Sequence, residues 1–585
     1  MLRTHTCGEL TTKDVSKNVC LCGWIASRRD HGDIIFMDIR DKFGVTQIVF
    51  DPEKNKDAHS QAHHLRGEYC VMVTGKVSKR PEGTVNSKIP TGKIEVEVEA
   101  VEVFSTSKTP PFEIRDDIEV SEEIRLKWRY LDMRRPSMQE RLRIRHKTCR
   151  FITNFLDGEE FISVETPMLT KSTPEGARDY LVPTRGQAGY FYALPQSPQI
   201  FKQLLMVGGV DKYFQIARCF RDEDLRADRQ PEFTQLDMEM SFVEEDDILA
   251  LSERLFKGLF SEILGKEIKI PFQRLDYEEA FDLYGSDKPD TRFDMFLCNL
   301  TEVAKKCDFK IFQNALEAGG RVMALVAPGY GDISRKEIDN LTDFVSEYGA
   351  KGLAYFKVEK EKLVSPITKF FSEEMLRTFR EKTGADTGDM IFLVASSRDV
   401  ACEALGALRT KIGREKGLIN TDKFNFLWVV NFPLFKFNKD EKRWVSEHHP
   451  FTSFRKEDTK FLEKGELGKV RSVAYDLVLN GCEIGSGSIR IHERDMQKKV
   501  FDALGLSQEE YSKKFGFLLD AFSYGAPPHG GVAFGLDRLL TIFTGDSSIR
   551  DVIPFPKTQK GGCPLTGAPS QVAEGQLKEL GIKLR

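Results

Sequence analysis

The sequence predicts a multidomain α+β protein. Its 585 residues are too many for one hydrophobic core, because a domain usually holds roughly 100–200 residues. The first hundred residues read as short strands, whereas the remainder alternates strands and helices and is interrupted by a second α+β unit. Apolar residues make up 40% and charged residues 30% of the chain, which is typical of a globular protein rather than a disordered one.

Five strand-like segments precede residue 107. The last one alternates Ile94, Val96 and Val98 with three glutamates, as expected for a half-buried strand. A polar helical stretch over 58–66 lies between the third and fourth segments. This order is that of an OB-fold β-barrel, which binds single-stranded nucleic acid on its open face. The five predicted strands cover 19–26, 34–39, 45–50, 70–76 and 94–104.

The remaining chain divides into four segments. Residues 108–140 begin with a proline pair and read as a linker or hinge. A larger domain follows over 141–284 and resumes over 426–585, with a C-terminal extension. Between these parts, residues 285–425 form an inserted α+β domain, with strands expected over 321–326, 353–358 and 390–394.

Charge and cysteine content restrict the function only weakly. The net charge is −4, but residues 124–150 contain ten Lys or Arg against Asp132 and Glu140. This excess fits either a surface that follows a phosphate backbone or a solvated helix face. The eleven cysteines form no CxxC pair, which favours reduced thiols over metal ligation. The polar N-terminus and the absence of a long apolar run predict a cytoplasmic protein without a membrane segment.

Two common nucleotide-binding patterns are missing from the sequence. No GxxxxGK[ST] loop occurs, and no GxGxxG follows a predicted strand. The run Lys76–Arg80 (KVSKR) resembles the KMSKS signature of class I synthetases, but it lies in the predicted barrel and no HIGH-like partner exists. We therefore assign this run to the surface at a strand end.

The stretch FRDEDLRADRQPEFTQLD over 220–237 is the most informative motif. A strand over 213–220 delivers Arg221, which can reach an α-phosphate, with Glu223 on the same face. The return strand offers Phe233 for stacking on adenine. This hairpin resembles motif 2 of class II aminoacyl-tRNA synthetases, and the expected catalytic domain of that class is built on an antiparallel sheet.

Motif 3 of the same family is similar to the segment over 530–538. Its small-residue strand meets a helix at Gly535, which places Arg538 in the first helical turn. There its guanidinium can cover the second face of adenine by cation–π stacking. Motif 1, the helix and strand that end at Pro167, forms the dimer interface in this family, so the resemblance implies a homodimer.

A third constellation follows from hairpin geometry. Asn480-Gly481 is a type I′ turn signal, and a two-residue loop there pairs Val478 with Glu483. Asp476 then shares a face with Glu483, and two such carboxylates can hold Mg²⁺ against ATP phosphates. An exposed hairpin with ordinary acids is the alternative. By strict alternation Arg490 faces away from Glu483, so its assignment to the same site requires a β-bulge near the glycines of this strand.

Signatures elsewhere are similar to the bacterial aspartyl-tRNA synthetase family. They are STPEGARDY over 172–180, QSPQIFK over 196–202 and HHPF over 448–451, together with the insertion over 285–425. The resemblance implies that Glu175 and Gln199 hold the substrate ammonium group, with Asp237 in support, and that Lys202 and Arg490 hold the side-chain carboxylate. A neutral asparagine amide would leave these cations unpaired. The full set expected to bind L-aspartate is Glu175, Gln199, Ile200, Phe201, Lys202, Arg221, Asp237, His448, His449 and Arg490.

The implied reaction needs no protein nucleophile. The aspartate α-carboxylate attacks the α-phosphorus of ATP, Arg221 and Mg²⁺ stabilise the charge, and the 3′-terminal hydroxyl of tRNA accepts the aminoacyl group. We predict Arg221 and Arg538 as catalytic and Asp476 and Glu483 as metal ligands. The expected ATP-binding residues are Arg221, Asp222, Glu223, Gln230, Phe233, Glu483, Gly535, Leu536, Asp537 and Arg538.

Alternatives are an asparaginyl or lysyl enzyme, disfavoured by Lys202 and Arg490, and a catalytically silent tRNA-binding paralogue. The second is disfavoured by the joint retention of Arg221, Glu223, Asp476, Glu483 and Arg538, since a silent copy has no chemical reason to keep all five.

The barrel is expected to read the anticodon. Phe36 is placed to stack on a base, Gln47 to read a base edge, and Arg28 and Arg29 to meet phosphates. Barrel core is the alternative location for Phe36. Aspartate and asparagine anticodons differ only in their third base, and family members that charge only tRNA(Asp) tend to carry leucine and lysine where this chain has His31 and Gly83. The pair resembles the non-discriminating type, which charges tRNA(Asp) and tRNA(Asn) and depends on a partner amidotransferase. A strictly discriminating enzyme is the alternative, with both residues as ordinary loop positions.

Overall fold

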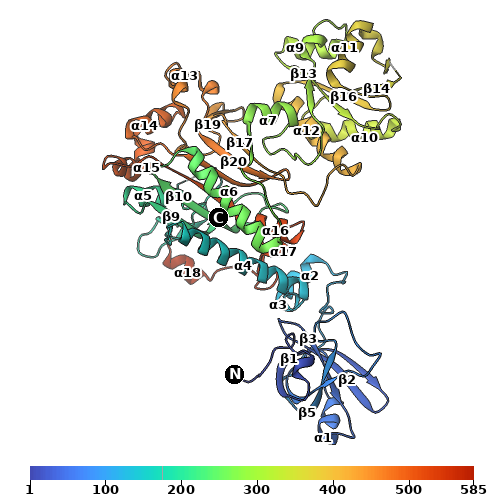
Figure 1. Cartoon of the computed structure of the whole chain (residues 1–585). Coiled ribbons are helices and arrows are strands. Elements are labelled where there is room, and N and C mark those ends of the chain that lie inside the picture. The colour runs from blue at the N-terminus through green and yellow to red at the C-terminus, as the bar shows by residue number, and fades with distance from the viewer. Residues whose placement is uncertain (174–175, 361, 585) are drawn as a thin grey trace. The chain divides into compact units, whose positions relative to one another are not determined.

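The computed structural model describes residues 1–173, 176–360 and 362–584, which Figure 1 draws as a ribbon. They form two compact units. Unit 1 comprises Met1–His146, Asp224–Gln230 and Leu540–Ala573, and unit 2 comprises Lys147–Glu223, Pro231–Leu539 and Glu574–Arg585. This grouping differs from the linear order of domains inferred from the sequence, since the linker and segment 540–573 pack with the N-terminal barrel. No helix among the described residues is long and apolar enough to cross a membrane.

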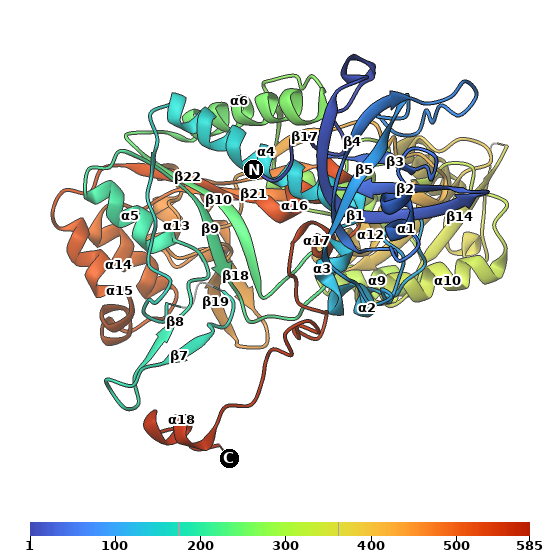
Figure 2. The same cartoon turned by 90° about the horizontal axis from the view of Figure 1, so that it is seen from below.

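The N-terminal barrel in unit 1 is closed, with strand order β1-β2-β3-β5-β4 and β4 paired back to β1 (Figures 1 and 2). Its core is aliphatic because alternate residues such as Leu21, Ile25, Met37 and Val73 point inward. Helix α1 is capped by Asn55 and lies between β3 and β4, so the predicted OB-fold is confirmed. The elements are β1 Asn18–His31, β2 Ile34–Arg40, β3 Val45–Phe50, α1 Lys56–Ala62, β4 Cys70–Lys79 and β5 Ile94–Ser105.

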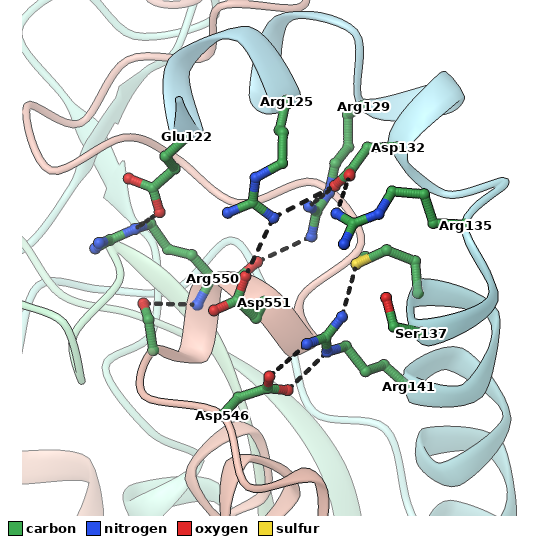
Figure 3. A network of polar contacts seen from close by, with 12 residues as sticks. Glu122, Arg125, Arg129, Asp132, Arg135, Ser137, Arg141, Asp546, Arg550 and Asp551 are labelled. Atoms are coloured by element: carbon green, nitrogen blue, oxygen red, sulfur yellow. Dashed lines mark hydrogen bonds and ion pairs between the residues drawn. The ribbon is translucent and has the colours of Figure 1, made fainter. Parts of the chain in front are cut away.

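The linker helices of unit 1 are joined to its C-terminal segment by a buried polar network (Figure 3). Arg129 in α3 contacts Asp132 at 2.6 Å and donates to the main-chain carbonyls of Arg550, Ile553 and Pro554. Arg141 forms a bidentate pair with Asp546. These helices are α2 Glu122–Lys127, α3 Arg129–Asp132, α4 Pro136–Gly158 and α17 Ile549–Val552.

The basic stretch over 124–150 therefore differs from both interpretations offered by the sequence. Several of its arginines neither form a solvated face nor follow a phosphate backbone, because they are used inside the protein. Arg134 lies 2.8 Å from Glu68 of the barrel and stacks on Trp24, and Arg135 lies 2.8 Å from Asp132. Sequence counting missed this role because two of the acidic partners, Glu68 and Asp546, lie far away in the chain, whereas Asp132 lies within the stretch.

Unit 2 is built on an eight-stranded sheet of order β11-β17-β20-β21-β22-β10-β9-β6, antiparallel except for its two outer pairs. Helix α6 covers one face (Figure 2), where Phe256 contacts Phe426 and Phe534 at ring-centroid distances of 5.7 and 4.9 Å. Asp237 and Glu239 alternate with buried Leu236 and Met238, so the opposite face carries the polar groups. The strands are β6 Ile162–Ser163, β9 Lys212–Phe220, β10 Glu232–Ser241, β11 Gln273–Asp276, β17 Phe426–Val430, β20 Ala474–Leu479, β21 Cys482–Ile489 and β22 His529–Gly535.

The segment between β11 and β17 carries its own five-stranded antiparallel sheet, β12-β13-β16-β14-β15, covered on both faces by helices (Figure 1). Helices α10 and α12 pack on one face, and α8, α9 and α11 on the other. The elements are β12 Leu297–Asn299, α8 Thr301–Ala304, α9 Lys310–Glu317, β13 Arg321–Ala327, α10 Arg335–Ser346, β14 Ala354–Glu359, β15 Lys362–Val364, α11 Glu373–Thr383, β16 Met390–Ser396 and α12 Arg398–Glu415.

Shorter elements surround the main sheet. Two hairpins, β7 with β8 and β18 with β19, stand outside it. All cysteines in the described residues are free, five of them buried and six half-buried. The remaining elements are β7 Leu181–Pro183, β8 Phe191–Ala193, α5 Gln199–Val207, α6 Glu245–Leu264, α7 Tyr277–Tyr284, β18 Phe435–Asn438, β19 Arg443–Ser446, α13 Thr459–Glu463, α14 Arg494–Ala503, α15 Gln508–Phe522, α16 Leu536–Thr544 and α18 Glu574–Glu579.

Candidate active site

The β9–β10 hairpin presents Arg221 beside an aromatic ring. Phe220 and Glu232 are paired across the two strands, and the Arg221 amide donates to the carbonyl of Pro231 at 3.0 Å. The guanidinium carbon of Arg221 then lies 5.0 Å from the centre of the Phe233 ring. A cation held over an aromatic face at a strand end can meet both a phosphate and a purine.

Gln230 has a different environment from the one its predicted role requires. It belongs to unit 1, where its side-chain amide donates to the carbonyl of Lys557 at 3.1 Å and accepts from the Lys557 amide at 2.7 Å. The neighbouring Asp222 takes part in an isolated bridge with Arg178. Gln230 therefore holds the segment after α17 through both ends of its amide.

The junction of β22 and α16 connects to both neighbouring strands. The Asp537 carboxylate accepts a hydrogen bond from the Thr234 amide at 2.8 Å, and Arg538 donates to the main-chain carbonyl of Glu483. Leu536 is buried in the core. The side chains of Leu536 and Asp537, both predicted for the ATP site, are thus used in packing and strand anchoring, which leaves their main chain for any contact with ATP.

The β20–β21 hairpin has the geometry predicted from its sequence. Asn480 and Gly481 both have positive φ, 55° and 79°, as a type I′ turn requires, and Val478 pairs with Glu483. The register then shifts, since Leu477 pairs with Gly485 and leaves Ile484 as an extra residue. This is the bulge that the assignment of Arg490 to the site required, and it lies next to the first glycine of the strand.

Asp476, which is buried, and Glu483, which is half-buried, form an acidic pair. Burial first, and the Asp476 carboxylate second, raise the pKa of Glu483. Oδ1 of Asp476 makes no hydrogen bond in the described chain, although Nε2 of His448 lies 3.4 Å from it. Burial opposes the charged imidazole, but the nearby carboxylate of Asp476 outweighs it and raises the pKa of His448. Two such carboxylates with an oxygen open to a further ligand fit a divalent cation.

These two carboxylates would be the protein ligands of Mg²⁺. No group of three or more His, Cys, Asp or Glu that could hold a metal occurs in the described residues. The other ligands would therefore come from water and phosphate, as is usual for Mg²⁺. The ion would neutralise charge that develops on the phosphates of ATP.

A second buried cluster lies on the polar face of the sheet. Lys202 of α5 contacts Asp237 at 3.0 Å and Glu239 at 3.2 Å. Arg490 grips the same Glu239 from the other side through Nε at 2.9 Å and Nη2 at 3.2 Å. A Cβ at Gly531 would overlap the Glu239 carboxylate, so glycine is required opposite it. Lys202 and Arg490 are 1% and 2% exposed, so two cations converge in a desolvated site.

The two histidines of the HHPF segment have different partners. Nη1 of Arg490 lies 2.7 Å from Nε2 of His449, whereas His448 contacts Asp476. Burial and the Arg490 charge place the pKa of His449 well below its usual range, which keeps this imidazole neutral. His449 thus lies beside Arg490, whereas His448 lies beside the acidic pair.

Further predicted aspartate-site residues lie on or near α5. Gln199 is buried and donates to Gln203 at 3.1 Å. Ile200 and Phe201 line a hollow with Gln196, Ser197 and Thr170. Glu175 lies outside the described residues. Sequence reasoning missed Glu239, Gln203 and His529. Glu239 was accessible to it, because it follows Asp237 by two residues on the same strand and must share its face.

Three of the predicted anticodon residues, Arg29, Phe36 and Gln47, lie on the outer face of the barrel. Phe36 is half-buried and alternates with core residues Ile35 and Met37, so the alternative that it is barrel core is wrong. The His31 and Phe36 rings form a T-shaped pair, with their centroids 5.9 Å apart. His31 ends strand β1 rather than lying in a loop, whereas Gly83 lies in an exposed turn with φ 86°.

Polar residues around Phe36 are already connected to one another. Arg29 lies 3.1 Å from Asp38 and donates to Gln47 at 3.2 Å, and Gln47 donates to Glu95 at 2.8 Å. Arg28 differs, because it pairs with Asp30 at 3.0 Å and reaches the carbonyls that follow α1. Arg29 and Gln47 thus share the face of Phe36, whereas Arg28 is directed to the end of α1.

Comparison with known proteins agrees with this geometry. Residues 121–559 match the family model described as tRNA synthetases class II (D, K and N), and residues 19–104 match the OB-fold nucleic acid binding domain. A barrel followed by an antiparallel sheet that carries motifs 2 and 3 defines an aminoacyl-tRNA synthetase, a ligase, of class II.

Within this class, the chain belongs to the aspartate–tRNA ligase family. It is 54% identical over 585 residues to a protein of Syntrophomonas wolfei named "Aspartate--tRNA(Asp/Asn) ligase", covering all of both chains. A Bacillus anthracis protein of the same name is 54% identical over 583 residues, which are 100% of this chain and 98% of that protein.

Solved structures share the fold at low sequence identity. An asparaginyl-tRNA synthetase from Pyrococcus horikoshii, complexed with asparaginyl-adenylate, has a TM-score of 0.59 at 19% identity, covering 95% of this chain and 99% of that one. An aspartyl tRNA synthetase from Entamoeba histolytica has a TM-score of 0.57 at 18% identity, covering 94% and 90%.

Proposed function

We propose that this enzyme activates L-aspartate with ATP and transfers it to the 3′ end of tRNA(Asp) and tRNA(Asn). The observation that carries the amino-acid assignment is the convergence of Lys202 and Arg490 on Glu239 in a buried site. Two desolvated cations that lie close together favour a substrate with a side-chain carboxylate. A neutral side-chain amide would interact with them less strongly at the same desolvation cost. The names of the full-length relatives agree with this assignment.

The roles of the remaining groups follow from their positions. Arg221, over Phe233, meets the α-phosphate and the purine, and Arg538 closes the other side of the base. Asp476 and Glu483 hold Mg²⁺, which neutralises charge as pyrophosphate leaves. Gln199 accepts a hydrogen bond from the substrate ammonium group. Positioning and charge neutralisation then supply the catalysis, without a covalent protein intermediate.

The test of amino-acid choice is ATP–pyrophosphate exchange with the purified enzyme. Exchange is expected with aspartate and Mg²⁺ and is expected to be absent with asparagine or lysine. Equal exchange with lysine or asparagine would overturn the assignment, and tRNA binding without exchange with any of the three amino acids would favour the silent paralogue.

The charging of both tRNAs rests on His31 and Gly83. His31 contacts Phe36, the residue we assign to base stacking, so it stands beside a base of the anticodon. At Gly83 an added Cβ meets nothing within 4 Å, so the turn has room for a long side chain, although its positive φ disfavours one. Position 31 therefore lacks the leucine, and position 83 the long cation, that the resemblance associates with rejection of the tRNA(Asn) anticodon.

Purified tRNA(Asp) and tRNA(Asn), charged at equal concentration, test this second part. A preference for tRNA(Asp) of about a thousandfold, some 4 kcal/mol, would show a discriminating enzyme. The double variant His31→Leu with Gly83→Lys is expected to reduce charging of tRNA(Asn) more than of tRNA(Asp). Phe36→Ala is expected to reduce both. A non-discriminating enzyme also implies an amidotransferase that converts Asp-tRNA(Asn).

Two further proposals concern assembly and location. Strand β6, at the edge of the main sheet, and the segment after it expose Ile162, Met168 and Leu169, which are 54%, 39% and 51% accessible. Apolar groups on an edge strand favour a homodimer through this motif 1 region. Family membership favours the cytoplasm, where tRNA charging takes place.

A further inference from the structure

A line of three buried polar side chains ends at Gln199. Nδ1 of His529 lies 2.8 Å from the carbonyl oxygen of Pro527. Nε2 of the same ring lies 3.2 Å from Nε2 of Gln203, and Oε1 of Gln203 lies 3.1 Å from Nε2 of Gln199. His529 and Gln203 are fully buried and Gln199 is 5% exposed, so water does not compete for these bonds.

The chemistry of the groups fixes the direction of every bond in this line. The Pro527 carbonyl can only accept, so Nδ1 of His529 carries the proton and donates. In a neutral imidazole the other nitrogen then accepts, which obliges Gln203 to direct its NH₂ group at His529. Its amide oxygen is therefore turned to Gln199, which must donate in turn. The Oε1 atom of Gln199 is left to face away from the line.

Its surroundings keep His529 neutral. Burial is the largest effect and lowers the pKa of the imidazole, reinforced by the charges of Arg490 and His492 and opposed by Glu239 of β10. From α15, the aromatic ring of Phe522 faces the His529 ring, with the two ring centroids 6.4 Å apart. The direction of the line thus holds at neutral pH.

We propose that His529, acting through Gln203, is a positioning residue that orients Gln199 to present its amide oxygen to the ammonium group of the substrate. This inference rests on the proposed function, which gives Gln199 its ligand. Gln199 is the first residue of α5, where exposed main-chain N–H groups disfavour a cation. If the Gln199 amide were free to flip, its NH₂ group would add two more donors at the start of α5. Recognition of an ammonium group therefore requires that the amide oxygen of Gln199 be held in place.

The test compares two substitutions of the same residue. His529→Gln keeps an acceptor near the position of Nε2, whereas His529→Asn reaches only the Pro527 carbonyl and releases Gln203. In ATP–pyrophosphate exchange we expect His529→Asn to raise KM for aspartate about tenfold, the value of one lost hydrogen bond to a charged group, with little change in KM for ATP. His529→Gln should recover most of the loss.

Succinate, which is aspartate without its ammonium group, separates orientation from general damage. Its inhibition constant against aspartate is expected to change less than about twofold in His529→Asn, because it makes no contact with the Gln199 amide. Gln203→Met removes the middle amide of the same line while nearly conserving side-chain volume. If His529→Asn does not fold, the same changes in KM for aspartate and in the inhibition constant of succinate are expected of Gln203→Met.

Two results would overturn the inference while leaving the proposed function intact. One is an unchanged KM for aspartate in folded His529→Asn and Gln203→Met. The other is an equal weakening of aspartate and succinate, which would indicate a distorted pocket. Absence of aspartate-dependent exchange in the unaltered enzyme would instead defeat the proposed function itself.

Discussion

Replacing Lys202 by methionine removes one of the two cations that converge on Glu239. The side chain keeps a similar volume, but Asp237 at 3.0 Å and Glu239 at 3.2 Å lose their shared partner. Truncating one member of a buried charge pair costs about 2–5 kcal/mol in binding. If Lys202 contacts the substrate carboxylate, kcat/KM for aspartate in exchange should fall by about 30- to 5000-fold, with little change in KM for ATP.

The same substitution should make stability depend on pH in a defined direction. Burial already raises the pKa of Asp237 while Lys202 lowers it, so removing Lys202 raises that pKa further. A carboxyl group whose pKa is higher in the folded protein than in the unfolded protein destabilises the fold when it ionises. The stability of Lys202→Met should therefore be highest at acid pH and fall as pH rises through the folded pKa, measured by urea unfolding.

Lys212→Met supplies the control, since this lysine of β9 makes a surface pair with Glu160 at 3.6 Å. Its stability should change by only about 0–1 kcal/mol and its exchange activity should stay near that of the unaltered enzyme. If folded Lys202→Met retains kcat/KM for aspartate within about threefold of the unaltered enzyme, Lys202 does not contact the substrate carboxylate.

Three other predictions concern separate parts of the molecule. Arg221→Ala should reduce exchange at least about 100-fold, because the α-phosphate loses its charged partner. The affinity for tRNA in a filter-binding assay should stay largely unchanged. A large loss of that affinity would contradict the proposal that the barrel binds tRNA separately from the catalytic site. His529→Gln should lessen acid destabilisation, because burial lowers the pKa of His529 in the folded protein below its usual value of 6.5. Such a histidine supports the fold above that pH and loses this contribution as pH falls, so melting temperatures of the two proteins that fall in parallel with pH would contradict the expectation. Arg129→Met should cost about 3–5 kcal/mol in urea unfolding, because the buried carbonyls of Arg550, Ile553 and Pro554 lose their donor and Asp132 loses one of its two close arginine partners. Exposed Arg143→Met should cost under about 1 kcal/mol, and equal effects would contradict a buried network.

Local rules sufficed where a feature depends on neighbours in the chain. The hairpin turn at Asn480 and Gly481 follows from backbone preference, and the pairing of Val478 with Glu483 follows from the turn. The barrel strands were similarly predictable, since alternation decides which side chains reach the core. The bulge after Glu483 could be inferred only by combining strand alternation with the chemistry expected of Arg490.

Features that depend on distant partners were not predictable from the sequence. The arginines between residues 124 and 150 resemble a nucleic-acid surface when counted, but Arg129 and Arg141 bond to groups beyond residue 540. Likewise Gln230 is bonded at both ends of its amide to Lys557. Charge density along a chain does not distinguish a free cation from one neutralised by a remote segment.

The bonding of Arg490 explains why a carboxylate, and not merely a polar group, is required in its site. Its five N–H groups are distributed over Glu239, Ser488, His449 and the carbonyl of Gly531. An incoming substrate group must therefore displace one of these partners, and neutral His449 is held less strongly than the Glu239 carboxylate. A carboxylate makes that displacement favourable, because Arg490 then bonds to a charged acceptor in place of a neutral one. An asparagine amide offers one neutral oxygen and directs its own donors at cations, so it gains nothing from the displacement.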